Sequence, residues 1–233
     1  MSRIPPSKGT CAFCKGVFPR AGMTRHLKSC AAYQASLGLE KGPKVARSHF
    51  FHLFVEGTDA PEYWLHLDVL AKATLGDLDQ FLRDTWLECC GHLSAFHIEN
   101  RYFEANTGAV DSMWPMIFGR PAPPESMRTR LSSVLRPGLK FSHEYDFGST
   151  TRLILKVMSE HEGASLQRVT ILARNELPEM QCSVCGKPAA WIDTFGEYEL
   201  YCEECADAEG RDLEGMLPVV NSPRMGVCGY TGW

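Results

Sequence analysis

Residues 63–86, YWLHLDVLAKATLGDLDQFLRDTW, decide the fold, because a strand pattern changes into a helix pattern within them. Over residues 63–69 apolar and polar positions alternate, which is the period of a strand with one buried face. Thr74 then precedes Asp77 by three residues, as an N-cap residue precedes its partner in a capping box. Apolar residues continue at helical spacing as far as Trp86, and Gly91 is placed as a C-cap. The stretch therefore predicts a strand followed by an amphipathic helix.

Further strand patterns lie on both sides of this helix. They cover His49–Glu56, Leu93–Glu99, Lys140–Tyr145, Arg152–Ser159 and Arg168–Arg174. We also expect a linker, a Pro-rich loop and a short helix, at Lys41–Lys44, Pro115–Pro124 and Ser126–Leu135. This order predicts an α+β fold in which a central sheet packs on one helix. The chain divides into a basic N-terminal segment, an α+β domain and a C-terminal segment with a tail, at residues 1–47, 48–176 and 177–233.

The composition is that of a globular protein. Of the 233 residues, 44% are hydrophobic and 22% are charged, which excludes an extended disordered chain. No apolar run reaches the roughly 18 residues that a membrane span needs, and the N-terminus lacks the apolar core of a secretion signal. We therefore expect a cytoplasmic protein that does not contact a membrane. A reducing compartment favours metal binding over disulfides for the ten cysteines.

The strongest motif lies near the C-terminus. Its four cysteines, called the C-terminal site, are Cys182, Cys185, Cys202 and Cys205. Two C-x2-C pairs separated by sixteen residues have the spacing of a structural zinc site. Each pair supplies two thiolates, and the hairpin between the pairs closes the tetrahedron of a zinc ribbon. Four protein ligands leave no open position for a substrate. A redox dithiol is the alternative interpretation of each pair.

A second motif lies near the N-terminus and has the pattern C-x2-C-x11-H-x3-C. Its four residues, called the N-terminal site, are Cys11, Cys14, His26 and Cys30. The last two are four residues apart, so they share one helix face, and Phe18 and Met23 are placed as the small core of a ββα unit. The motif resembles a zinc finger whose last His is Cys. The alternative is a surface His beside free thiols. Together the two motifs predict two structural zinc ions.

The net charge of -4 is divided unevenly along the chain. Residues 1–47 contain nine Lys and Arg and one acid, which gives +8 and leaves -12 for the remaining residues. Such a basic segment can hold a nucleic-acid backbone or dock on the acidic body of the protein. Of the base-reading positions of a zinc finger, only Arg25 can make a bidentate contact, so we do not expect sequence-specific DNA reading. The candidate nucleic-acid contacts are Lys8, Lys15, Arg20, Arg25 and Lys28.

Four stretches carry a family resemblance: HFFHLFVEG (49–57), residues 63–86, GHLSAFHI (91–98) and FSHEYDFGS (141–149). Over residues 48–160 the chain resembles the plasmid pRiA4b ORF-3-like family. The resemblance implies a β-grasp-like sheet against a helix and a link to mobile elements, because some members are labelled transposon passenger proteins or resolvases. This chain departs from the family's His-Leu-His at Ser94. It departs again after Gly148, where Asp-x-Trp-x-His is replaced by Ser-Thr-Thr-Arg-Leu.

The candidates for a polar centre in the central domain are His92, His143 and Asp146. If the fold brings them together, they form an acid–base or metal centre. The alternative is a structural turn, in which Asp146 accepts hydrogen bonds from nearby N–H groups and Gly148 has a positive φ.

Three cysteines remain outside both motifs. Cys89 and Cys90 are expected in the last helical turn, where adjacent side chains face different directions. Cys228 lies in the tail, residues 221–233, which we expect to dock on the protein.

Two functions follow from these observations. The first is a zinc-binding, non-enzymatic adaptor that binds an unknown protein or nucleic acid through its basic N-terminal segment. The alternative is an enzyme of mobile-element or nucleic-acid metabolism with a site in the central domain. The sequence leaves the partner and the oligomeric state open.

Overall fold

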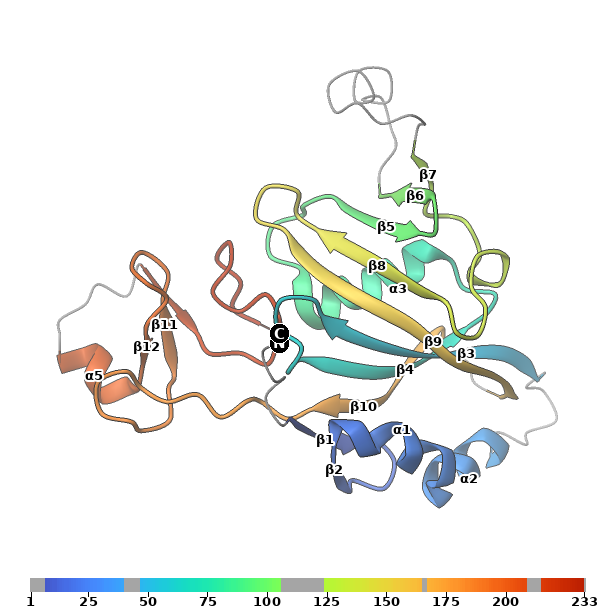
Figure 1. Cartoon of the computed structure of the whole chain (residues 1–233), viewed down its shortest axis with the longest axis horizontal. Coiled ribbons are helices and arrows are strands. Elements are labelled where there is room, and N and C mark those ends of the chain that lie inside the picture. Colours follow the sequence, from blue (N-terminus) through green and yellow to red (C-terminus); the bar gives the residue numbers. More distant parts are fainter. Residues whose placement is uncertain (1–6, 40–46, 106–123, 165–166, 209–214, 233) are drawn as a thin grey trace.

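The structure, a computed structural model, describes residues 7–39, 47–105, 124–164, 167–208 and 215–232. The predicted linker and, apart from Pro124, the predicted Pro-rich loop lie outside these residues. Within them the chain is a mixed α/β protein with one large sheet and few helices (Figure 1), which confirms the predicted class. No helix among them is long and apolar enough to cross a membrane.

Ten strands of the described residues form one sheet in the order β2-β1-β10-β4-β3-β9-β8-β5-β6-β7. Neighbouring strands are antiparallel except β6 and β7. The strands predicted from sequence are present, with small shifts of their ends. Their bounds are β1 Lys8–Cys11, β2 Val17–Pro19, β3 Ser48–Gly57, β4 Trp64–Leu70, β5 Ser94–Ile98, β6 Arg101–Glu104, β7 Glu125–Ser126, β8 Lys140–Tyr145, β9 Thr151–Gly163 and β10 Val169–Asn175.

One face of the sheet packs on helix α3 (Leu75–Leu82), as Figure 1 shows. The capping box predicted at its start is confirmed. Thr74 Oγ1 accepts a hydrogen bond of 3.1 Å from the Asp77 amide, and Asp77 Oδ2 accepts one of 2.8 Å from the Thr74 amide. Apolar side chains of α3 and of the facing strands are buried together in the main core.

The helix ends earlier than predicted. After α3 the chain makes one π-helical turn, Arg83–Leu87, and the helix ends there. The turn is π-helical because the Glu88 amide donates to the carbonyl of Arg83, five residues back. The predicted C-cap at Gly91 is therefore wrong. Gly91 has a φ of 78° in the following loop, where its N–H donates to the Glu88 carboxylate at 2.6 Å. Cys89 and Cys90 lie in this loop and not in a helical turn, which corrects their predicted position.

Helices α1 (Arg20–Ser29) and α2 (Ala31–Leu39) cover the part of the other face that is formed by β10, β4 and β3. We predicted a strand with one exposed face at residues 63–69, and this prediction is wrong. Trp64, His66 and Asp68 are all buried, because the N-terminal helices pack over them. The buried residues of this second core are Cys11, Met23, Leu27, Cys30, Tyr33, Trp64, Leu172 and Ala173.

The N-terminal hairpin extends the main sheet. Strand β1 pairs with β10, with Gly9 opposite Asn175, so the sheet crosses the boundary predicted at residue 47. A side chain at Gly9 would begin 2.3 Å from the Trp64 ring, so the close passage of β1 over this ring requires glycine. The indole N–H of Trp64 donates to Ser7 Oγ at 2.9 Å. Strands β1 and β2 are therefore part of the main sheet.

The C-terminal segment forms a second, three-stranded sheet in the order β12-β11-β13. Figure 1 shows it extending to one side of the main sheet, after which the tail returns to the main body. Ser222, Arg224 and Tyr230 of the tail are buried, as expected for a docking segment. The elements are β11 Trp191–Asp193, β12 Leu200–Tyr201, α5 Glu203–Ala208 and β13 Met216–Pro218.

The helix predicted at Ser126–Leu135 is reduced to a 3-10 turn at Leu131–Ser133, preceded by β7. The residues between them form a turn beside the start of α3, in which the Thr129 amide donates to the Ser126 carbonyl. Their carbonyls at Met127 and Thr129 accept from the N–H groups of Gly76 and Leu75. These carbonyls satisfy free N–H donors at the start of α3. In a helix of their own they would accept from that helix instead.

Candidate metal centres

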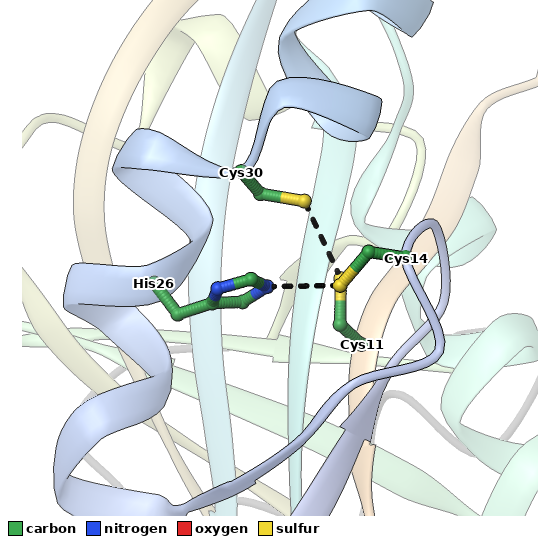
Figure 2. Close-up of side chains that lie close together, drawn as sticks. All are labelled: Cys11, Cys14, His26 and Cys30. Carbon is green, nitrogen blue, oxygen red and sulfur yellow. Dashed lines mark hydrogen bonds between the residues drawn. The ribbon is translucent and has the colours of Figure 1, made fainter.

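The four residues of the N-terminal site come together as predicted. Their ligand atoms all lie within 4.8 Å of one another. The turn after β1 carries Cys14, α1 carries His26, and Cys30 stands at the end of α1 (Figure 2). The sulfurs of Cys11 and Cys30 are 3.9 Å apart, and Cys14 Sγ is 3.4 Å from His26 Nε2. Zn–S bonds of about 2.3 Å place tetrahedral sulfurs about 3.8 Å apart, so the group has the size of a zinc cage.

Packing and backbone hydrogen bonds orient these ligands. Phe18 stacks on the His26 ring at 3.7 Å between centroids, and Met23 is fully buried beneath them. The Gly16 amide donates to Cys14 Sγ at 3.4 Å, and this bond lowers the pKa of Cys14. Burial raises the pKa of Cys11. The group is therefore held in place by the fold and has one thiol ready to ionise.

The four cysteines of the C-terminal site also lie within 4.8 Å of one another. The sulfurs of Cys185 and Cys202 are 3.6 Å apart. Burial acts to raise the pKa of Cys182, but hydrogen bonds from the amides of Cys202, Cys185 and Val184 outweigh it and lower this pKa to about 6. Gly186, with a φ of 71°, donates to the Cys182 carbonyl and closes the first turn. The thiolates needed for metal binding are thus favoured by the backbone.

A third group, which we did not predict, has the same compactness. Its members, called the tail site, are Cys89, Cys90, His92 and Cys228, and their ligand atoms lie within 4.8 Å of one another. The described residues thus contain three groups that are close enough to bind a metal ion, where the sequence predicted two. The local signal was Cys-Cys-x-His at residues 89–92. The fourth ligand is 136 residues beyond His92, so no spacing rule connects it to the others.

The structure brings together two of the three residues proposed for a central polar site. His92 Nε2 is 3.6 Å from Asp146 Oδ2. His143 is fully buried and pairs instead with Asp79 of α3, at 2.7 Å. Asp146 accepts from the Gly148 amide at 3.0 Å, as the structural alternative predicted. The positive φ, 65°, belongs to Asp146 itself and not to Gly148, which corrects the predicted turn.

The five basic residues proposed as nucleic-acid contacts divide into two sets. Arg20 is half-buried, bonds to the Glu56 carboxylate and to the Pro61 carbonyl, and lies over the Phe54 ring. It therefore holds the N-terminal segment on the acidic body. The other four side chains are exposed: Lys8, Lys15, Arg25 and Lys28.

No family model and no curated protein matches the chain. Among solved structures, the chain is similar to the crystal structure of a protein of unknown function, MM3350 from Methanosarcina mazei Go1. The two are 15% identical with a TM-score of 0.43, and the match covers 54% of this chain and 68% of that chain.

Proposed function

We propose that the chain is a zinc-binding, non-enzymatic interaction protein whose terminal segments are folded by metal ions. The observation that carries this proposal is the composition of the N-terminal and C-terminal sites, each of which has four Cys or His ligands in one compact group. A set of four thiolate or imidazole ligands selects zinc among the common metal ions. Four protein ligands leave no position for a substrate, so both ions are structural.

The N-terminal ion has a specific structural task in this proposal. It joins the β1–β2 hairpin to α1 and so fixes the helix that covers the second face of the sheet. Met23 and Leu27 of α1 pack there in the core that contains Trp64. The order β1, β2, α1 supports a ββα finger, and the hairpin between Cys185 and Cys202 supports a ribbon. Membership of the pRiA4b ORF-3-like family, and with it a link to mobile elements, is part of the proposal.

The interaction surface in this proposal is the exposed basic face of the N-terminal segment. Its residues are Lys8, Lys15, Arg25 and Lys28. Among the described residues no carboxylate forms an ion pair with any of them, whereas Arg20 is already paired with Glu56. Free Lys and Arg side chains on one small module suit a phosphate backbone, which they hold without reading bases.

Metal analysis and a binding assay test the two parts separately. Elemental analysis of the purified chain is expected to find zinc, and Cys11→Ser and Cys182→Ser are each expected to lose one ion per chain. A chain that folds without bound metal would contradict the zinc assignment.

Binding to random-sequence duplex DNA tests the proposed partner. Affinity is expected to fall steeply with salt and to weaken in a variant with Lys8, Lys15, Arg25 and Lys28 changed to Gln. The matched control changes four other exposed basic residues to Gln: Lys72, Arg128, Arg130 and Lys140. Equal affinity of the two variants would remove nucleic acid as the partner of the basic face.

A further inference from the structure

The tail site combines residues from two distant parts of the chain. The loop after the π-helical turn carries Cys89, Cys90 and His92, and the docked tail carries Cys228. Cys90 Sγ lies 3.5 Å from Cys89 Sγ and 3.8 Å from Cys228 Sγ. His92 Nε2 lies 2.9 Å from Cys90 Sγ and 3.2 Å from Cys228 Sγ. Pairs of ligand atoms in the N-terminal and C-terminal sites are separated by similar distances, 3.4, 3.6 and 3.9 Å.

We propose that Cys89, Cys90, His92 and Cys228 bind a third zinc ion, which fastens the C-terminal tail to the central domain. Three thiolates and one imidazole in a tetrahedron form a closed structural zinc site. The donor set is the same as that of the N-terminal site, although the residues come from unrelated positions. The proposal is independent of the proposed function, which rests on the other two sites.

The backbone of the loop is shaped so that adjacent cysteines face one point. On a helix, Cys89 and Cys90 would point in different directions. Here the helix has ended, and Tyr145 Oη accepts hydrogen bonds from the amides of Cys89 and His92 at 3.4 and 3.3 Å. The same hydroxyl donates to the Glu88 carboxylate at 2.9 Å, and this carboxylate also accepts from Gly91. The loop is thus held by a network behind the ligands, as a metal site requires.

A buried positive charge lies beside the proposed ion. Arg224, which is fully buried, donates to Cys89 Sγ at 3.4 Å and to Asp146 Oδ2 at 2.7 Å. Three thiolates around a divalent ion carry a net charge of -1, which this guanidinium offsets on one side. Cys90 and Cys228 are exposed on the other side, which gives an ion a route from solvent.

A disulfide is the competing use of these cysteines. It joins two sulfurs at about 2 Å and leaves the third thiol and the imidazole without a role. His92 Nε2 instead faces both Cys90 and Cys228, which are the ligands from the two different segments. One ion uses all four groups, so the geometry favours metal.

The consequence is a crosslink between residues 138 positions apart, Cys90 and Cys228. The tail between β13 and this ligand already contacts the central domain. Ser222 Oγ donates to the Trp86 carbonyl at 2.6 Å, at the π-helical turn that leads to the loop. The third ion therefore anchors the far end of a segment that is docked at its start.

Native mass spectrometry of the intact wild-type chain, purified with zinc, tests this proposal directly. We expect three ions per chain. We expect two in Cys228→Ser and in His92→Ala, and three again in His92→Cys, which restores a ligand. The same number of ions in the wild type as in Cys228→Ser and His92→Ala would overturn the proposal. A wild-type mass about 2 Da below that of the reduced chain, with Cys90 and Cys228 joined in one peptide, would overturn it in favour of a disulfide.

Hydrogen exchange separates this ion from the other two. Loss of the tail ion in Cys228→Ser is expected to increase exchange in residues 222–230. The control Cys182→Ser is expected to lose one ion and leave exchange in these residues unchanged. Equal protection of the tail in wild type and Cys228→Ser would contradict the anchoring role. Absence of metal from the N-terminal and C-terminal sites would contradict the proposed function and leave this result intact.

Discussion

The guanidinium of Arg224 donates a hydrogen bond of 2.7 Å to the carboxylate of Asp146 and so joins the C-terminal tail to the turn after β8. Both side chains are almost fully removed from solvent. Burial acts to raise the pKa of Asp146, but the bonds from Arg224 and from the amides of Gly148 and Ser149 together outweigh it and hold this pKa below its usual value. The same guanidinium donates to Thr151 Oγ1 and to the Ser149 carbonyl. One tail residue therefore supports the whole turn.

Replacing Arg224 with Met leaves the Asp146 carboxylate buried without its partner. We expect a loss of about 3–5 kcal/mol in the free energy of unfolding, the range for breaking one side of a buried ion pair. Urea unfolding at neutral pH measures it. The control is Arg152→Met, which removes an exposed ion pair with Glu144 and should cost about 1 kcal/mol or less. Equal losses in the two variants would contradict a buried role for Arg224.

The capping box at the start of α3 gives a second prediction. Thr74→Ala removes the oxygen that accepts from the Asp77 amide, and we expect a loss of about 1 kcal/mol in unfolding free energy. Thr58→Ala, at an exposed threonine outside any helix, is the control and should leave stability nearly unchanged. A Thr74→Ala protein as stable as the control would show that the cap does not stabilise the helix.

The contact between α2 and the sheet gives a third prediction. Tyr33 Oη donates to the buried carboxylate of Asp68 at 2.5 Å, which binds the N-terminal helices to β4. Tyr33→Phe is expected to cost about 1–3 kcal/mol, because the buried carboxylate loses a hydrogen-bond donor. Hydrogen exchange should increase in α1 and α2 and remain unchanged in α3. An increase spread evenly over the chain would contradict a local docking role.

The pair His52 and His66, 2.9 Å apart beneath the N-terminal helices, predicts a dependence of stability on pH. Burial lowers the pKa of His52 to about 4 and that of His66 to about 3. Between pH 6.5 and 4 the unfolded chain therefore binds protons that the folded chain does not. Stability is fully present above pH 6.5 and is lost as the pH falls through this window, by on the order of 3 kcal/mol for His52 alone.

Unfolding of the wild type and of His52→Asn between pH 8 and pH 5 measures this contribution. Metal release at low pH affects both proteins, so the difference between their slopes isolates the histidine. The wild type should lose more stability over the range. Identical slopes would mean that His52 titrates normally in the folded chain.

The sequence predicts local features of this protein well. The spacing of Cys182 and Cys185 from the second pair predicts a compact four-cysteine group, and Thr74 with Asp77 predicts the start of the central helix. Both depend on residues less than about 25 positions apart, where chain geometry limits the outcome. The strand at Lys140–Tyr145 is likewise present with the predicted bounds.

Long-range relations were missed for a physical reason. The pattern of β4 does not reveal what lies above Trp64, because a covered second face and an exposed one differ only in what packs there. The pairing of β1 with β10 and the approach of Cys228 to Cys90 join positions far apart in the chain. No spacing signal linked Cys228 to the other ligands of the tail site, and His92 was grouped with His143, which the fold places against Asp79.

The central claim is that metal ions occupy the N-terminal and C-terminal sites. Anomalous diffraction from crystals of the chain, measured on both sides of the zinc absorption edge, tests it most directly. We predict one peak amid Cys11, Cys14, His26 and Cys30 and one amid Cys182, Cys185, Cys202 and Cys205, each present above the edge and absent below it. Folded chains with no anomalous peak at either group, or with disulfide density joining these cysteines, would contradict the account.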